Sequence, residues 1–189
     1  MPPSEQVFRQ VGERELITTS YLRFVEASFL DPEGRPFQRQ IVRHPGAVCI
    51  VPLEADGTIV MIRQFRAPLG RAILEIPAGK LDVPGEPPAE CARRELAEEV
   101  GRVAGRLVEI GAFYNSPGFT DELTSCYLAE DLSPVGRATQ GTEERFMTLE
   151  HVPLSGVWGL FESGELVDAK TILACCLAGR ARAAPGGVG

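Results

Sequence analysis

Three glutamates, Glu95, Glu98 and Glu99, fall close together on the one strongly helical stretch of the sequence, Pro87 to Val100. Glu95 and Glu99 are an i, i+4 pair, so on a helix their like charges are neighbours and cost about a few tenths of a kcal/mol. A divalent cation would compensate them, because hard ions such as Mg²⁺ bind carboxylate oxygens together with phosphate oxygens and water. The alternative interpretation is a solvated acidic face balanced by neighbouring arginines.

The ends of this helix are well marked. Prolines at positions 87 and 88 are tolerated in a first turn, Glu86 lies beside the positive end of the helix dipole, and Gly101 follows as a stop. An apolar stripe at helical spacing is formed by Ala89, Ala92, Leu96 and Val100. The helix therefore presents one face to a core and carries the glutamates beside that face.

This helix and the loop before it resemble the Nudix box, which is a glycine, a glutamate and an Arg-Glu-apolar-x-Glu-Glu-x-Gly run on a loop-helix-loop. The matching residues are Gly79, Glu86, Arg94, Glu95, Leu96, Glu98, Glu99 and Gly101. The sequence departs from the family pattern once, because six residues rather than five separate Gly79 from Glu86. We place the extra residue in the turn at residues 81–85, where an insertion leaves the helix untouched.

The resemblance implies that two or three Mg²⁺ or Mn²⁺ ions bind at this helix. Glu95 and Glu99 would be the main ligands, with Glu98 assisting and the backbone carbonyl of Ala78 as a further ligand. Bound ions would neutralise charge that develops on a diphosphate and lower the pKa of the attacking water, so the implied chemistry is phosphoanhydride hydrolysis. The other box positions would be structural, with an ion pair bracing the loop against the helix: Gly79, Glu86, Arg94 and Gly101.

Residues outside the box resemble the ADP-ribose pyrophosphatase subgroup of that family. Pro117 lies sixteen residues after Gly101, within Ser116–Glu122, where the subgroup carries a proline loop. Taken alone, this segment would equally suit an ordinary Pro-Gly turn between strands. The segments Arg63–Arg66 and Leu74–Gly79 resemble the same subgroup.

The subgroup resemblance assigns substrate-binding roles to two residues. Arg66 would hold a substrate phosphate, since a planar guanidinium suits bidentate contact with diphosphate oxygens. Its alternative is a surface arginine at the end of a strand. Glu122 would contact the terminal ribose or the reacting water, and its alternative is a solvated charge on a loop.

The catalytic base is expected on a second loop. Members of the family carry it on a mobile loop, which corresponds here to the residues after the glycine-bearing stretch 136–141. Glu143 and Glu144 open a predicted strand at this place, and either carboxylate could accept a proton from the attacking water. We favour Glu144 ahead of Glu143. The alternative is a pair of charges on a surface loop.

The elements around these residues predict an α/β (α+β) protein. By resemblance its fold is the Nudix fold, an α/β/α sandwich around a mixed sheet, with a small N-terminal antiparallel sheet between Val7 and Val42. Apolar or alternating runs predict core strands at residues 46–53, 58–65, 72–77, 107–114, 123–128 and 145–149. The Asp-Gly pair at positions 56 and 57 suits a hairpin between the first two. Helices are predicted at residues 87–100, 151–163 and 169–181.

The sequence divides into three predicted parts. These are an N-terminal β segment at residues 1–43, a Nudix hydrolase domain at residues 44–182 and a frayed tail at residues 183–189. A strand-rich segment this small cannot bury both of its faces, which favours a partner chain. In the subgroup such a segment forms an intertwined homodimer whose partner lines the adenosine pocket, and Phe37 and Arg39 are candidates for residues lent across it.

Composition disfavours several other classes of protein. The net charge of −7, from 19 basic and 26 acidic residues, disfavours a large nucleic-acid-binding surface. The five cysteines lie mostly in apolar runs and form no C-x-x-C pair, which predicts buried thiols in a reducing, cytoplasmic compartment. No stretch approaches the ~20 apolar residues of a membrane span, and the N-terminus has no signal-peptide pattern.

These resemblances together imply metal-dependent hydrolysis of ADP-ribose to AMP and ribose 5-phosphate. One alternative is another nucleotide sugar such as GDP-mannose, because related sequences share the Arg63–Arg66 and proline-loop neighbourhood. A second alternative is a sensor that binds ADP-ribose without catalysis. If the chain were a sensor, we would expect some of the box glutamates to be replaced, and none is. The sequence also contains no spare helix-turn-helix segment, which a regulator would use.

Overall fold

The computed structural model of the protein describes residues 7–138 and 141–183. The chain forms two compact units, one of Met1–Gly46 with Tyr114–Leu123 and the other of Ala47–Phe113 with Thr124–Gly189. The first unit therefore combines the N-terminal strands with a segment from the middle of the chain. Of the predicted tail, only Ala183 lies within the described residues, and it ends the last helix.

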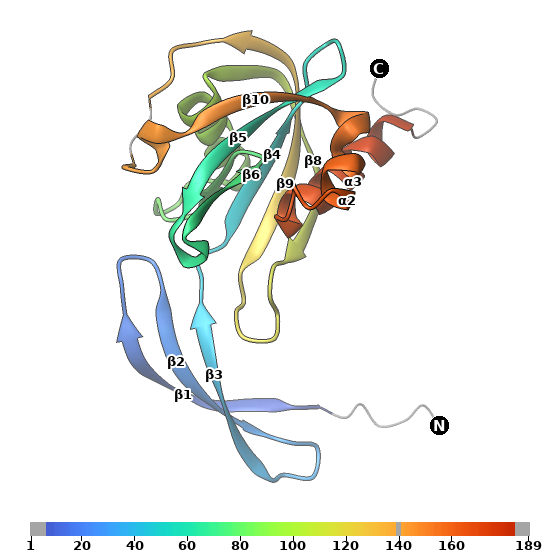
Figure 1. Ribbon diagram of the computed structural model, residues 1–189. Helices are drawn as coiled ribbons and strands as arrows, with labels where there is room; N and C mark the ends of the chain where they lie inside the picture. The colour runs from blue at the N-terminus through green and yellow to red at the C-terminus, as the bar shows by residue number, and fades with distance from the viewer. Residues whose placement is uncertain (1–6, 139–140, 184–189) are drawn as a thin grey trace. The chain divides into compact units, whose positions relative to one another are not determined.

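The N-terminal unit contains the small antiparallel sheet that the sequence predicted. Its three strands neighbour one another in chain order (Figure 1), and their bounds are β1 Arg9–Thr18, β2 Arg23–Leu30 and β3 Pro36–Arg43. The turn between β2 and β3 is fixed by Asp31, whose carboxylate accepts the backbone N–H groups of Glu33 and Arg35, both at 2.9 Å. Local side-chain bonds of this kind are typical of aspartate-initiated turns.

The segment Tyr114–Leu123 belongs to the same compact unit as this sheet, although its two end residues also belong to the strands that flank it in sequence. The backbone N–H of Val42 donates to the carbonyl of Phe119 at 2.8 Å. Asp121 accepts the backbone N–H of His44 at 2.8 Å and forms an ion pair with Arg43 at 3.0 Å. The proline loop is thus fastened to the end of β3, which the interpretation as an ordinary turn did not anticipate.

The larger unit contains two sheets. The first is antiparallel, with strand order β10-β5-β6, and the second has the order β7-β4-β9-β8. The second sheet is mixed, because β4 pairs antiparallel with β7 and parallel with β9. The strand bounds are β4 Ala47–Pro52, β5 Thr58–Arg66, β6 Arg71–Glu75, β7 Ala78–Lys80, β8 Arg102–Tyr114, β9 Leu123–Pro134 and β10 Thr148–Pro153.

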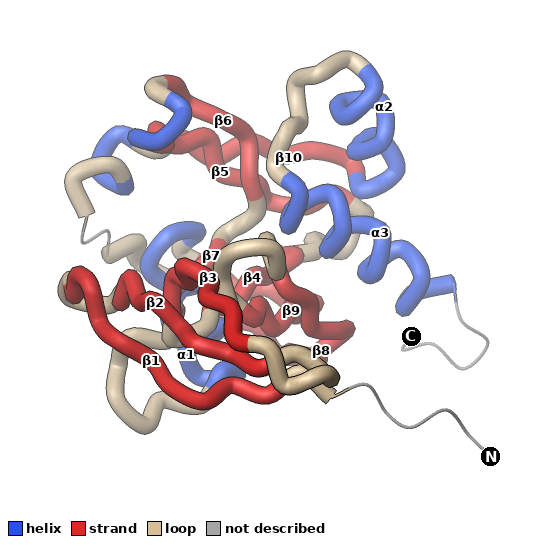
Figure 2. Tube along the Cα trace, turned by 90° about the horizontal axis from the view of Figure 1, so that it is seen from below, coloured by secondary structure: helices blue, strands red, loops and turns tan. Residues whose placement is uncertain are grey.

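Helices cover both sides of these sheets (Figure 2). Their bounds are α1 Pro88–Glu95, α2 Val157–Glu162 and α3 Ala169–Ala183. Alternate residues of β4 enter two different cores: Cys49 and Val51 pack with residues of α2 and α3, whereas Val48 and Ile50 pack with residues of α1. Successive strand side chains point to opposite faces, so this alternation defines three layers. The predicted α/β/α sandwich is confirmed.

The predicted hairpin at Asp56-Gly57 is correct only for its turn. Gly57 has φ 87°, and the backbone N–H of Glu54 donates to the carbonyl of Thr58 at 2.8 Å. Beyond the turn, however, the strands share only a bridge between Leu53 and Ile59 and then enter different sheets. Both strands are buried on both faces, and their separation lets each contribute to the two cores.

The predicted helix at residues 151–163 is wrong in its first half. His151 to Pro153 belong to β10, which pairs with β5 from Thr148 to Pro153, and α2 begins only at Val157. Pairing with a neighbouring strand therefore outweighs the local helical pattern. The strand predicted to begin at Arg145 begins only at Thr148, because residues 144–146 form a 3₁₀ turn.

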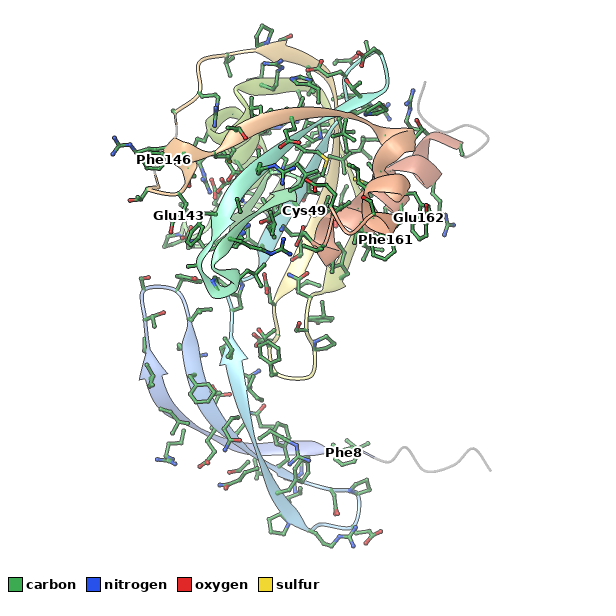
Figure 3. All side chains as sticks on the ribbon, viewed as in Figure 1. Phe8, Cys49, Glu143, Phe146, Phe161 and Glu162 are labelled. Atoms are coloured by element: carbon green, nitrogen blue, oxygen red, sulfur yellow. The ribbon has the colours of Figure 1, made fainter. Side chains whose placement is uncertain are left out.

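The cysteines are all free thiols, as predicted. Four are buried, among them Cys49 in the interior of the sandwich (Figure 3), and Cys176 is exposed. Within the described part of the chain, no helix has both the length and the apolar character needed to cross a membrane.

Gly101, which ends the acidic helix, should be sensitive to substitution. Its φ is 67°, and a Cβ there would lie 2.7 Å from Cγ of Arg137 and 3.0 Å from the carbonyl oxygen of Val135. We expect Gly101→Ala to lower the free energy of unfolding by about 2 kcal/mol, because backbone strain adds to a close contact.

Gly70→Ala is the matched control, because Gly70 has φ 63° but open space around its Cα, so we expect a loss of about 1 kcal/mol from strain alone. Urea denaturation followed by circular dichroism measures both losses. Equal losses would show that the approach of Arg137 and Val135 does not constrain this position.

Candidate active site

The acidic residues lie on the last turns of the helix that begins at Pro88. α1 ends at Glu95 and continues as one π-helical turn, Leu96–Val100. Single π turns inside helices are rare and occur frequently at functional sites. The helix is anchored by a row of buried side chains that includes most of the predicted stripe: Cys91, Ala92, Leu96 and Val100. The glutamates lie beside this anchor, so the packing of the helix fixes their position.

Strand β7 holds two of the glutamates against its backbone. A Cβ at Gly79 would lie 2.1 Å from Oε1 of Glu95, so a larger residue would displace that carboxylate. The neighbouring Ala78 donates its backbone N–H to Oε2 of Glu99 at 3.0 Å. The glycine of the loop therefore leaves room for the close approach of Glu95, and Ala78 lies beside Glu99.

Arg94 links the loop to the helix. Its Nε and Nη2 donate to the two oxygens of Glu86 at 2.9 and 3.0 Å, and its Nη1 donates to Glu95 at 2.8 Å and to Glu98 at 3.1 Å. The hydrogen bonds to Glu86 are the main reason why the pKa of Arg94 is raised. The expected ion pair between Glu86 and Arg94 is present, and the same guanidinium also partly neutralises Glu95 and Glu98.

Burial makes two of the carboxyl groups hard to ionise. Only 4% of Glu99 is exposed; its burial raises its pKa to about 8, and the charge of Glu95 adds to this effect. Burial likewise raises the pKa of Glu95 to about 7, although Arg94 opposes it. Two adjacent carboxyl groups with raised pKa values form a site that gains from a bound cation.

The donor chemistry of this cluster fits a hard divalent cation. Glu95, Glu98 and Glu99 offer carboxylate oxygens from neighbouring helical positions, and such oxygens are the ligands that Mg²⁺ and Mn²⁺ prefer. The arrangement is not preformed, since the described residues include no group of three or more His, Cys, Asp or Glu side chains arranged to hold a metal ion. Glu95 and Glu98 both accept hydrogen bonds from Arg94 instead.

Glu144 is the loop glutamate whose charge reaches the helix. It begins the 3₁₀ turn Glu144–Phe146 before β10, rather than opening a strand as predicted. Its negative charge contributes to the raised pKa values of both Glu95 and Glu99. Glu143 is the exposed residue just before this turn (Figure 3). The structure therefore brings Glu144 into the electrostatic range of the predicted metal ligands.

Arg66 ends β5 and is held by a residue that the sequence analysis did not single out. Its Nε and Nη2 donate to the two oxygens of the fully buried Glu75, each at 2.6 Å, and Lys170 binds the same carboxylate. Arg66 and Glu99 influence each other's pKa through their charges, so both belong to one electrostatic cluster. A signal was present in the sequence, since Glu75 is the one charged residue in the apolar run Ala72–Pro77.

Glu122 lies in the N-terminal unit. Its backbone N–H donates to Oγ1 of Thr120 at 3.2 Å, and its carbonyl accepts the N–H of Asn115 at 3.3 Å, so its backbone is fixed within the proline loop. The residues of the acidic helix, Arg66 and the two candidate bases all belong to the larger unit.

Comparison with known proteins places this geometry in context. The family described as NUDIX domain matches residues 42–172. The ADP-ribose pyrophosphatase of Bacillus subtilis (strain 168) is 47% identical over 143 residues, which cover 76% of this chain and 77% of that protein. The ADP-ribose pyrophosphatase of Mycobacterium tuberculosis (strain ATCC 25618 / H37Rv) is 37% identical over 169 residues, covering 89% and 82%.

More distant relatives differ in name but share the fold. The GDP-mannose pyrophosphatase of Citrobacter koseri (strain ATCC BAA-895 / CDC 4225-83 / SGSC4696) is 31% identical, covering 69% of this chain and 71% of that protein. A crystal structure of an ADP compounds hydrolase superposes with a TM-score of 0.82 at 23% identity, covering 98% of this chain and 99% of that one. This last likeness establishes the fold alone.

The raised pKa values give the metal-free protein a distinctive dependence on pH. Glu99 has a pKa of about 8 when folded against an ordinary value of 4.5, so the folded state binds its proton more tightly and stability falls as pH rises between these values. In EDTA we therefore expect the free energy of unfolding to decrease by on the order of 2 kcal/mol from pH 5 to pH 8.

Glu99→Gln removes the titrating group, so this variant should lose much of the decrease and should be more stable than the wild type at pH 8 in EDTA. Urea titrations at several pH values measure the effect. Identical pH profiles for the two proteins would contradict the assignment of a raised pKa to Glu99.

Proposed function

The chain belongs to the Nudix family, and we propose that it hydrolyses ADP-ribose to AMP and ribose 5-phosphate with the help of divalent metal ions. The observation that carries the proposal is the single cluster formed by Glu95, Glu99, Glu144 and Arg66. It combines donors for a hard cation, a carboxylate suited to accept a proton and a guanidinium suited to bind phosphate. The ADP-ribose pyrophosphatases at 47% and 37% identity support the choice of substrate.

We infer that Glu95 and Glu99 hold two or three Mg²⁺ or Mn²⁺ ions, with Glu98 and the carbonyl of Ala78 as further ligands. When bound, these ions supply positive charge to the diphosphate oxygens and lower the pKa of the attacking water. Glu95 and Glu98 would give up their bonds to Arg94 to take part, whereas the bidentate pair of Arg94 with Glu86 can persist and keep the loop attached to the helix.

Arg66 and Glu144 complete the proposed mechanism. Arg66 would bind the diphosphate, and its Nε and Nη2 atoms are already held by hydrogen bonds to Glu75. Glu144 would accept a proton from the water as that water attacks phosphorus, and the bridging P–O bond of the diphosphate would break. Glu143, the neighbouring candidate, is exposed, which supports Glu144 as the base.

We also infer a homodimer in which the N-terminal unit of one chain lines the adenosine site of the other. Within this unit β1 is an edge strand, and it exposes the large apolar side chains of Val11 and Ile17. The unit also contains a cavity of about 370 Å³ whose lining includes Phe37 and Arg39, with the Arg39 guanidinium 4.9 Å from the ring centroid of Phe37. An aromatic ring and a guanidinium are surfaces on which an adenine can stack.

Two alternatives lie behind this proposal. A pyrophosphatase for another nucleotide sugar, such as GDP-mannose, would use the same acidic helix and differ only in the substrate contacts. A sensor without catalysis is disfavoured, because every glutamate of the box is present and Glu95 and Glu99 lie side by side in the structure. Glu122 would contact the terminal ribose in the favoured case.

A substrate panel tests the proposal directly. The candidate substrates are ADP-ribose, GDP-mannose, UDP-glucose, NADH and Ap4A, each with Mg²⁺, with Mn²⁺ and with EDTA, and phosphate release after phosphatase coupling is measured. We expect metal-dependent turnover with ADP-ribose as the best substrate. Preference for another substrate would leave the proposed reaction intact and contradict the choice of ADP-ribose as the substrate. Binding of ADP-ribose without turnover would favour the sensor.

The choice of base can be tested with a matched pair of variants. We expect Glu144→Gln to lower kcat by about 10² to 10⁴-fold, the usual contribution of a general base, while Glu143→Gln changes it by less than about threefold. KM should change little in both. Circular dichroism controls for folding. A larger loss for Glu143→Gln than for Glu144→Gln would transfer the role to Glu143.

A further inference from the structure

A fully buried carboxylate, Glu75, lies behind Arg66. Both of its oxygens accept from Arg66 at 2.6 Å, and Oε2 also binds Nζ of Lys170. Burial by itself would raise the pKa of Glu75, but the two cations outweigh burial and the pKa is lowered. Glu75 is therefore an ionised group inside the protein, and a buried charge of this kind must be well paired.

The start of α3 brings Lys170 to this carboxylate. Asp168, just before the helix, accepts from Nζ of Lys170 at 2.8 Å, from the backbone N–H of Thr171 at 3.1 Å and from Oγ1 of Thr171 at 2.5 Å. Thr171 is fully buried, and its Oγ1 accepts the backbone N–H of Ile76 at 2.9 Å. Two separate links therefore join the first turn of α3 to the residues at the end of β6.

The result of these contacts is a guanidinium held by one edge. Nε and Nη2 of Arg66 are both used by Glu75, while Nη1 has no hydrogen-bond partner among the described residues. The Arg66 side chain is 40% exposed although Glu75 is not exposed at all. The positive charge of Arg66 partly offsets the rise in the pKa of Glu99, which links Arg66 electrostatically to the acidic helix.

We propose that Lys170 is a positioning residue for Arg66 and acts through the buried carboxylate of Glu75. Lys170 shares Oε2 of Glu75 with Nη2 of Arg66, so it fixes where that carboxylate lies and thereby where the guanidinium points. Without Lys170, Glu75 would keep a single cationic partner in a site closed to water, and the carboxylate and Arg66 would shift together. The inference rests on the proposed function, in which Arg66 contacts a substrate phosphate.

Steady-state kinetics of Lys170→Met with ADP-ribose is the first test. We expect KM to rise about tenfold and kcat to change by less than about threefold, because the contact to the diphosphate is weakened equally in the ground state and in the transition state. Thr171→Val is the matched control, since it removes the hydroxyl bonds to Ile76 and Asp168 but leaves the ion pairs of Lys170 with Glu75 and Asp168; it should lower thermal stability and leave KM unchanged. Lys170→Gln, which can still donate to Glu75, serves if the Met variant does not fold.

A double-mutant cycle tests whether the effect passes through Arg66. In an Arg66→Ala background, Lys170→Met should raise KM no further, because the group that it positions is gone. Fully additive effects, or a wild-type KM for Lys170→Met, would overturn the inference and leave the proposed function intact. An Arg66→Ala variant with unchanged KM would instead overturn the role of Arg66 in the proposed function.

NMR of the arginine side chain supplies a readout that needs no substrate. The Nε–H of Arg66 should exchange slowly with solvent in the wild type and in Thr171→Val, and several times faster in Lys170→Met. Faster exchange in Lys170→Met alone would support positioning by Lys170 even if the substrate were another nucleotide sugar. Equal exchange rates in all three proteins would overturn the inference.

Discussion

The larger unit depends on holding carboxyl groups out of water at a helix that must also pack against a core. Glu99 is nearly inaccessible, and the backbone N–H of Ala78 is a poor substitute for hydration of a full charge. Glu95 approaches the backbone of Gly79 so closely that a larger residue there would displace its carboxylate. The protein keeps this costly arrangement because the same apolar stripe that buries the helix also fixes where its acidic side chains lie.

Two arginines form ion pairs with glutamates of the larger unit, and both pairs have the same geometry. Arg94 binds Glu86 through both oxygens beside the acidic helix, and Arg66 binds Glu75 through both oxygens at the end of β5. In each case a fork-like guanidinium fixes direction as well as charge, which a lysine could not do. The pairs differ in burial, because Glu86 is partly accessible while Glu75 is sealed, and the sealed carboxylate takes a second cation from α3.

Sequence analysis succeeded where the relevant interactions are local. Glu86 and Arg94 are eight residues apart on one loop and helix, and the ion pair that the family resemblance implied for them is present. The link from Glu75 to Lys170 spans 95 residues, and no local pattern fixes which helix meets the end of β6. The same reason explains the failed hairpin between β4 and β5, since sheet membership is decided by partners far away in sequence. A charge inside an apolar strand predicts only that some partner exists.

The residues proposed for the chemistry and the proline loop belong to different units of the chain. The acidic helix, Glu144 and Arg66 all belong to the larger unit, which carries the residues proposed for the chemistry at the diphosphate. The proline loop with Glu122 is fastened to β3 through Arg43 and Asp121, and so belongs with the N-terminal sheet. The prediction that Glu122 contacts the substrate therefore concerns a different unit from the predictions for the acidic helix, Glu144 and Arg66.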